Sequence, residues 1–146
     1  EFQYLAIDYI NEVKDLLRVE DIKNIEKLLT TKSWWDSVDA INKIIGYLVF
    51  KYPEMKDETI LNWSKSENIW LKRVSILFQL RYKENTDREF LTRVILENSR
   101  TDEFFINKAI GWALREYSKT NREWVRDFIE KNDLSRLSVR EGSKYI

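Results

Sequence analysis

Residues 34–52 read WWDSVDAINKIIGYLVFKY, and the segments IWLKRVSILFQLRYK (residues 69–83) and FFINKAIGWALREYSK (residues 104–119) repeat its pattern. Equivalent positions lie 35 residues apart, as Trp35, Trp70 and Phe105 do. Within each segment the apolar residues recur with the spacing of an α-helix, and a polar turn and a second helical stretch follow. Helix pairs at a constant period indicate a repeat protein. The sequence therefore predicts an all-α fold, an α-solenoid of antiparallel helix pairs with a concave face.

The second helix of a predicted pair begins at a polar residue. Asp87 and Asn121 stand where the N-caps of two such helices are expected, because their side chains can accept hydrogen bonds from free backbone N–H groups. A further helix pair is predicted upstream, over residues 2–17 and 19–31, and a last helix near residues 138–146. We expect residues 1–146 to form a single domain.

Composition excludes several classes of site. The 146 residues include no cysteine and no histidine, which removes disulfides, thiol chemistry, imidazole catalysis and most transition-metal sites. A transition-metal site is therefore not expected, and no organic cofactor is expected either. No apolar run approaches the ~20 residues that a membrane-spanning helix needs, and no signal peptide is apparent, so a cytoplasmic protein is expected. The net charge is zero, but residues 61–146 carry 17 Lys and Arg against 13 Asp and Glu. This local excess of positive charge is compatible with a polyanionic partner.

The repeat allows side chains on different helices to be compared on one helical wheel. At about 100° per residue, one face collects tryptophans and charged residues within an arc of roughly 100°: Trp35, Asp39, Arg73, Arg81, Lys108 and Trp112. A second face is largely aliphatic and is the expected core stripe: Trp34, Ile41, Leu48, Ile69 and Ile76. Three more tryptophans are also expected in the core: Trp63, Trp70 and Trp124.

Each residue of the first face has an ordinary structural explanation when it is taken alone. A Trp at helical spacing usually packs in a core, a lone Arg is usually a solvated charge, and an Asp in a first turn usually stabilises the helix dipole. Asp36 fits that last role better than Asp39, which lies one turn further in. Taken together, the Trp, Asp and Arg residues on one face of three repeats indicate a binding groove. Periodicity alone does not identify the ligand of that groove.

Four segments together resemble the successive signatures of the AlkD-like DNA alkylation-repair glycosylases, a family of HEAT-like helical repeats: TKSWWDSVDAI (31–41), WLKRVSILFQL (70–80), FFINKAIGWALREYSKTN (104–121) and LSRLSVREGSKYI (134–146). The resemblance covers essentially the whole chain. It implies a monomeric enzyme of the bacterial cytosol or nucleoid that excises N3- or N7-alkylated purines from double-stranded DNA. The first ten residues, EFQYLAIDYI, resemble the middle of a family segment, so N-terminal repeats are expected to be absent from this chain.

The resemblance also implies catalytic residues. The family's active-site tryptophan and aspartate, four residues apart, match Trp35 and Asp39, and its second cleft tryptophan matches Trp112. As the glycosidic bond breaks, positive charge moves onto the sugar. A carboxylate ~4 Å from that charge gains roughly 4 kcal/mol at an effective dielectric near 20, or about a thousandfold in rate, whereas a Trp face contributes about 0.5–2 kcal/mol. We therefore expect Asp39 to dominate and to position the attacking water, with the two tryptophans framing the lesion.

Basic residues are expected to hold the phosphates of DNA. The family's phosphate-contacting arginine matches Arg73, and four further residues are candidates: Lys108 and Arg115, with Lys32 and Arg81 as weaker ones. Because phosphates carry no sequence information, we expect binding with little sequence preference that weakens steeply with salt.

Two other functions remain open. A non-enzymatic DNA-binding solenoid would keep a basic groove without chemistry, but phosphate binding requires neither Trp35 nor Asp39, and a carboxylate in the groove repels DNA. A protein–protein scaffold is the commonest use of helical solenoids. A scaffold is expected to have an apolar or acidic groove, whereas Arg73, Arg81 and Lys108 make this one partly basic.

Overall fold

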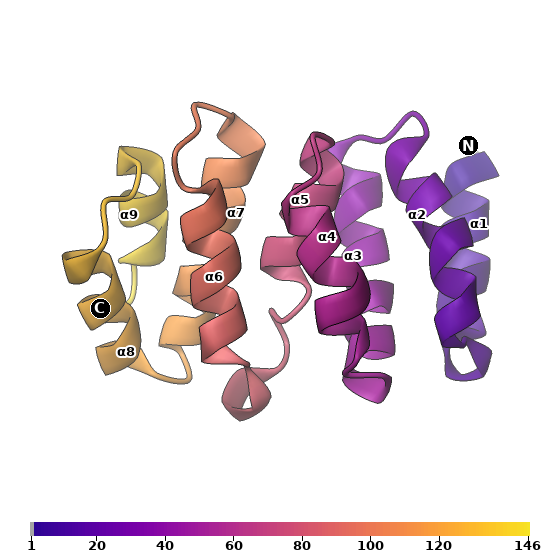
Figure 1. The fold of residues 1–146 in the computed structure, drawn as a ribbon, viewed down its shortest axis with the longest axis horizontal. Helices are drawn as coiled ribbons and strands as arrows, with labels where there is room; N and C mark the ends of the chain where they lie inside the picture. The colour runs from indigo at the N-terminus through magenta and orange to yellow at the C-terminus, as the bar shows by residue number, and fades with distance from the viewer. Residues whose placement is uncertain (1) are drawn as a thin grey trace. The chain divides into compact units, whose positions relative to one another are not determined.

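The structure, a computed structural model, describes residues 2–146, with side chains from residue 4 onward, and within that range it contains helices and no β-strand. Figure 1 shows the nine α-helices of these described residues: α1 (Phe2–Glu12), α2 (Ile22–Thr30), α3 (Trp35–Lys51), α4 (Leu61–Ser64), α5 (Ile69–Leu77), α6 (Arg88–Asn98), α7 (Phe104–Ser118), α8 (Arg122–Lys131) and α9 (Arg136–Gly142). The prediction of an all-α fold is confirmed.

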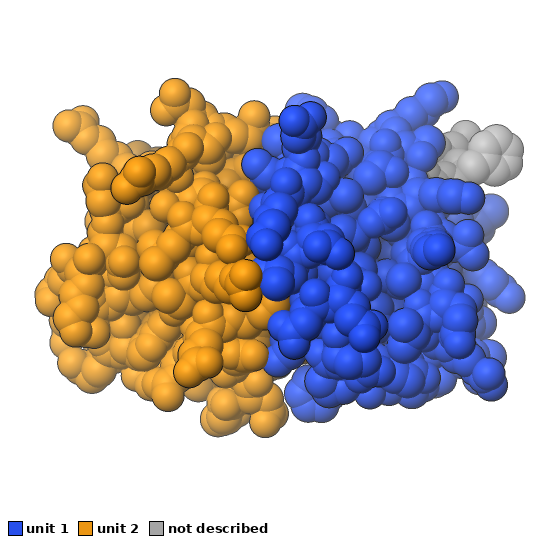
Figure 2. Space-filling view, viewed as in Figure 1, with its two compact units in different colours: residues 1–78 blue, residues 79–146 orange. Residues whose placement is uncertain are grey.

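The chain divides into two compact units, residues 1–78 and residues 79–146, which Figure 2 colours separately. In the first unit α1 packs on α3, α3 packs on α5, and α2 lies against both α3 and α5. In the second unit α7 packs on α8 and on α9. Helices that pack on one another in this way within each unit are consistent with the α-solenoid class. The predicted pair of α5 and α6 straddles the division, and the single domain stays a prediction.

Polar side chains cap the helices where the predicted turns end. Asp87 accepts a hydrogen bond from the N–H of Phe90 at 3.0 Å, and Asn121 accepts one from the N–H of Trp124 at 3.0 Å, so both predicted N-caps are confirmed. Asn68 caps α5 in the same way and accepts from two N–H groups of its first turn, at 2.9 and 3.3 Å. Each cap satisfies backbone donors that the first helical turn leaves without a partner.

The predicted core stripe is buried in its middle and exposed at its start. Three of its residues are at most 1% exposed: Ile41, Leu48 and Ile76. Ile69, the first residue of α5, is only partly buried. Of the other tryptophans expected in the core, Trp63 is buried at 3% exposure, whereas Trp70 and Trp124 are half-buried.

The expectation that Trp34 packs in the core is wrong, because its side chain is 56% exposed. Trp34 is the N-cap residue of α3 and has an extended backbone, with φ −138° and ψ 164°. Its side chain therefore does not follow the helical wheel that predicted burial. The ring instead meets Trp70 edge to face, with ring centroids 5.9 Å apart and an interplanar angle of 67°.

Some helices are shorter or less regular than the apolar pattern predicts. The helix expected over residues 69–83 ends at Leu77, because the buried amide of Gln79 bonds both backbone groups of Asp87, accepting at 2.7 Å and donating at 3.3 Å. These bonds favour a turn over a continued helix. The remaining helical turns are short: 3₁₀ turns at Lys14–Leu16, Val19–Asp21 and Lys83–Asn85, and a π-helical turn at Lys56–Ile60 that leads into α4.

Candidate active site

Trp35 is the first residue of α3, and Asp39 follows one helical turn later on the same side of the helix. The start of α3 is secured by Ser37, whose hydroxyl donates to the carbonyl of Trp34 at 3.0 Å. Trp35 therefore stands at the end of the helix, where it is 47% exposed. The side chain of Asp39 lies deeper and is 19% exposed. An exposed aromatic ring and a partly sheltered carboxylate thus share one side of α3.

Arg73, on α5, forms a bidentate ion pair with Asp39. Its Nε donates to Oδ1 at 2.9 Å and its Nη2 donates to Oδ2 at 3.1 Å. Hydrogen bonds between two charged groups are roughly twice as strong as neutral ones, and the bidentate geometry fixes the plane of the carboxylate. A carboxylate offers about four lone-pair positions, so about two remain on Asp39 for a water or another donor.

The same ion pair bears on the implied role of Arg73. Its side chain is only 5% exposed and its guanidinium is directed at Asp39. The implied contact of Arg73 with a DNA phosphate stays a prediction. Because the Arg73 side chain is buried, little of its surface is open to a phosphate. The helical wheel placed Arg73 and Asp39 on one face but did not indicate that they bind each other, because it compares directions and not distances.

Asp36, three residues before Asp39, has different partners. Its Oδ2 accepts a hydrogen bond from the hydroxyl of Tyr4 on α1, and its Oδ1 accepts one from the N–H of Ser37 at 2.8 Å. The hydrogen bond with Tyr4 lowers the pKa of Asp36 and raises the pKa of Tyr4. Asp36 therefore serves the start of α3 and its contact with α1, which leaves Asp39 as the carboxylate on the Trp35 side of the helix.

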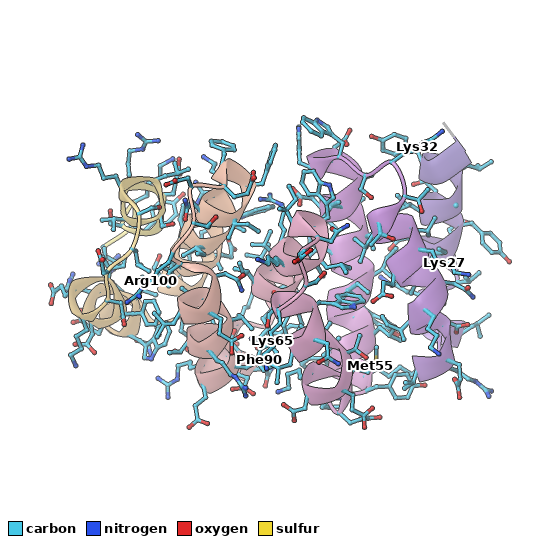
Figure 3. All side chains as sticks on the ribbon, turned by 45° about the horizontal axis from the view of Figure 1, so that its top comes forward. Lys27, Lys32, Met55, Lys65, Phe90 and Arg100 are labelled. Atoms are coloured by element: carbon cyan, nitrogen blue, oxygen red, sulfur yellow. The ribbon has the colours of Figure 1, made fainter. Side chains whose placement is uncertain are left out.

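The two weaker candidates for phosphate binding, Lys32 and Arg81, lie in connections between helices. Lys32 is exposed in the connection between α2 and α3 (Figure 3), where its backbone is left-handed with φ 49°. Arg81 is exposed in the turn that follows α5. Arg81 belongs to the second unit, so its approach to Asp39 stays a prediction.

The candidates on α7 belong to the second unit. Lys108 and Arg115 converge there on Glu141 of α9, a residue that sequence reasoning missed: Lys108 Nζ donates to Oε1 at 2.7 Å, and Arg115 Nη1 donates to Oε2 at 3.4 Å. The partners are 33 and 26 residues away along the chain, so no local pattern could have revealed them. Trp112 is half-buried on the same helix. Its approach to Asp39, which lies in the other unit, stays a prediction.

Residues 2–146 show neither a group of acids that could bind a metal nor a helix that could cross a membrane. The described acids form no group of three or more that could hold a metal ion. In the same part of the chain, no helix has the length and the apolar character that crossing a membrane requires.

Comparison with known proteins identifies the family. A sequence model described as "DNA alkylation repair enzyme" matches residues 1–146. A solved structure described as "Predicted DNA alkylation repair enzyme from Enterococcus faecalis" is similar with a TM-score of 0.93 and 39% sequence identity, covering 99% of this chain and 68% of that one. No curated protein matches. The whole-chain match to the family model and the similarity to this solved structure agree with each other, and the chain belongs to the family of DNA alkylation repair enzymes.

Proposed function

We propose that this chain is a monofunctional DNA glycosylase, a hydrolase that removes positively charged N3- or N7-alkylpurines from duplex DNA as a monomer and without a cofactor. The observation that carries the proposal is the carboxylate of Asp39, held by Arg73 through bonds of 2.9 and 3.1 Å on the side of α3 that also bears the exposed ring of Trp35. Membership of a DNA alkylation repair family supports a damaged-DNA substrate.

The proposed reaction breaks the bond between the sugar C1′ and a purine nitrogen. Because the alkylated base carries a formal positive charge, it departs with the bonding electron pair as a neutral molecule, and the positive charge passes to the sugar as an oxocarbenium-like ion. Water then adds to C1′ and releases a proton. Catalysis therefore needs negative charge and a positioned water beside the sugar more than it needs an acid for the leaving base.

Asp39 is suited to supply both the negative charge and the water. The lone pairs that Arg73 leaves unused can accept a hydrogen bond from the attacking water and orient it. A carboxylate ~4 Å from the developing charge gains roughly 4 kcal/mol, and the positive charge of Arg73 at roughly twice that distance removes about half of it. The ion pair therefore lowers the expected contribution of Asp39 from about a thousandfold to about thirtyfold in rate.

The other predicted residues would bind the damaged base and the sugar-phosphate backbone of DNA. The exposed ring of Trp35 is suited to the cationic base, at about 0.5–2 kcal/mol, and Trp112 would supply a second aromatic face. The more exposed basic residues would contact phosphates: Lys32, Arg81, Lys108 and Arg115. The buried guanidinium of Arg73 is better suited to holding Asp39 than to holding DNA.

The proposal is tested by single-turnover release of 7-methylguanine from methylated duplex DNA. Asp39→Asn removes the charge and keeps the shape, so we expect release to slow by about ten- to hundredfold while DNA is still bound. Asp36→Asn is the matched control, because it makes the same charge change on the same helix at a carboxylate that Tyr4 and Ser37 engage. We expect Asp36→Asn to release 7-methylguanine at close to the wild-type rate.

Equal rates for wild type and Asp39→Asn, both well above the uncatalysed rate, would show that the catalytic assignment of Asp39 is wrong. Because Asn cannot neutralise the buried Arg73, each variant should first be shown by circular dichroism and thermal unfolding to be folded at the assay temperature.

A second candidate is a non-enzymatic DNA-binding protein of the same family. The observation that favours it is the neutralisation of Asp39 by Arg73, since an ion pair between α3 and α5 would also suit a structural role. The same assay separates the two functions: DNA binding without release by the wild-type chain would support the binding protein.

A further inference from the structure

Glu141 of α9 gathers three cations on one carboxylate in the second unit. Its Oε1 accepts from Lys108 Nζ at 2.7 Å, and its Oε2 accepts from Arg115 Nη1 at 3.4 Å and pairs with Lys144 Nζ at 2.9 Å. The Glu141 side chain is 7% exposed, whereas those of Lys108, Arg115 and Lys144 are 39%, 27% and 49% exposed. The carboxylate is therefore the buried centre of a half-exposed basic cluster.

Gly111 explains how this carboxylate reaches its position. It lies on α7 three residues after Lys108 and four before Arg115, so all three positions share one face of the helix. A Cβ on Gly111 would come within 2.6 Å of the Cβ of Glu141. The missing side chain thus lets Glu141 approach α7 between the two cations.

The charges in the cluster do not balance. A structural ion pair between α7 and α9 needs one cation, but Lys108, Arg115 and Lys144 surround the single carboxylate of Glu141, and the cluster has a net charge of +2. Like charges held this close repel one another. An ammonium has three donors and a guanidinium five, so the cluster retains donors for an acceptor that approaches from solvent. A polyanion would relieve the repulsion and use those donors.

We propose that Glu141 is a positioning residue that orders Lys108, Arg115 and Lys144 as one binding site for phosphates of the DNA backbone. The inference rests on the proposed function, because it takes the substrate to be DNA. It adds Lys144 to the residues that contact DNA and gives Glu141 the role of holding them in place. Glu141 itself would not touch DNA.

The substitution Glu141→Gln tests this proposal, because the two possible roles of Glu141 predict opposite changes in the affinity for DNA. If Glu141 only reduces the positive charge, Glu141→Gln raises the net charge of the cluster and duplex DNA should bind more tightly. If Glu141 positions the cations, Glu141→Gln frees them and binding should weaken. We expect the Kd for an undamaged duplex at fixed salt to rise at least threefold. The slope of log Kd against log salt should fall by about 0.9, which corresponds to the loss of about one phosphate contact.

Glu123→Gln is the matched control, because Glu123 is 78% exposed and pairs with Arg126 on the same helix. Its loss of one negative charge should leave the affinity equal to or slightly tighter than that of the wild type. Circular dichroism and thermal unfolding establish that Glu141→Gln is folded at the assay temperature. A salt slope is also a readout that a merely structural role of Glu141 would leave unchanged.

A second variant keeps the test decisive if Glu141→Gln unfolds. Lys144→Met removes one cation and leaves Glu141 paired with the other two, and it should also reduce the salt slope by about 0.9. Tighter or equal binding by Glu141→Gln with an unchanged slope would overturn the inference, as would an unchanged slope for Lys144→Met. A wild-type chain that binds no duplex would instead overturn the proposed function, and the inference with it.

Discussion

At the scale of single residues, two aspartates of α3 differ because of what contacts them. Asp36 bonds the exposed hydroxyl of Tyr4 and a backbone N–H, whereas Asp39 faces the buried guanidinium of Arg73. Both lie within the first two turns of one helix, Asp36 in the first turn and Asp39 in the second. The tertiary partner therefore decides which carboxylate is held rigidly, and a rigidly held group is what catalysis by positioned charge requires.

Removing Arg73 should destabilise the fold. Arg73→Met keeps the packing volume but leaves Asp39 without its bidentate partner, and we expect the free energy of unfolding to fall by about 1–3 kcal/mol. The 19% exposure of Asp39 allows it to recover part of its hydration, which holds the effect to that range. Arg93→Met, at a 52% exposed residue that pairs with Glu97 on its own helix, should cost less than about 0.5 kcal/mol.

Urea unfolding of the two variants measures this difference. Equal losses for Arg73→Met and Arg93→Met would show that the Asp39 ion pair stabilises the fold no more than an exposed pair on one helix does. A double-mutant cycle with Asp39→Asn would then isolate the energy of the pair itself.

At the scale of helices, α7 and α9 approach each other through two glycines. A Cβ on Gly111 of α7 would meet the Cβ of Glu141 at 2.6 Å, and a Cβ on Gly142 of α9 would meet the Cβ of Leu114 at 3.1 Å. The contact is completed by Ser138, whose hydroxyl donates to the carbonyl of Asn107 at 2.8 Å. Close packing of these two helices is what brings the Glu141 carboxylate to the basic side chains of α7.

Gly111→Ala should therefore destabilise the protein although alanine is the better helix former. The gain in helix propensity is about 1 kcal/mol, but a 2.6 Å approach forces α9 or the stem of Glu141 to move, at a cost of about 1–3 kcal/mol. Gly142→Ala meets its neighbour at 3.1 Å, a tight contact that a small shift can relieve, so its net effect should be smaller. Thermal unfolding of both variants checks the order, and a more stable Gly111→Ala would contradict it.

At the scale of the whole molecule, a balanced charge conceals groups that depend strongly on their partners. The sequence has 25 basic and 25 acidic residues, yet the hydrogen bonds from Lys108 and then Lys144 lower the pKa of Glu141 from 4.5 to about 2. A carboxyl whose pKa is lower in the folded protein than in the unfolded chain stabilises the fold above its unfolded pKa. That stabilisation is lost as the pH falls through the folded value.

The stability difference between wild type and Glu141→Gln should therefore depend on pH. It should be constant above about pH 5, shrink between pH 4.5 and 2, and vanish below that range. Below that range Glu141 is protonated and therefore neutral, as Gln is at every pH. Urea midpoints measured across this range give the curve. Glu123→Gln should show no comparable change, and a difference that stays constant down to pH 2 would show that the Lys108 and Lys144 bonds do not lower this pKa.

The sequence by itself determined the class of the fold and the starts of α6 and α8. Hydrophobic periodicity and the 35-residue repeat depend only on neighbours along the chain, and so do the caps at Asp87 and Asn121. The spacing of Trp35 and Asp39 likewise sets their shared side of α3, because four residues make about one helical turn. These features are local, and local features can be predicted without knowing how the helices pack.

Only the tertiary structure decided what those side chains contact. The wheel assumed helical geometry at Trp34, but this residue precedes the helix and is exposed. Arg73 and Glu141 each meet partners from 26 to 34 residues away, and their bonding depends on distances between helices that periodicity does not contain. A wheel gives the direction of a side chain, whereas an ion pair also requires that two backbones approach closely, and that approach is set by packing.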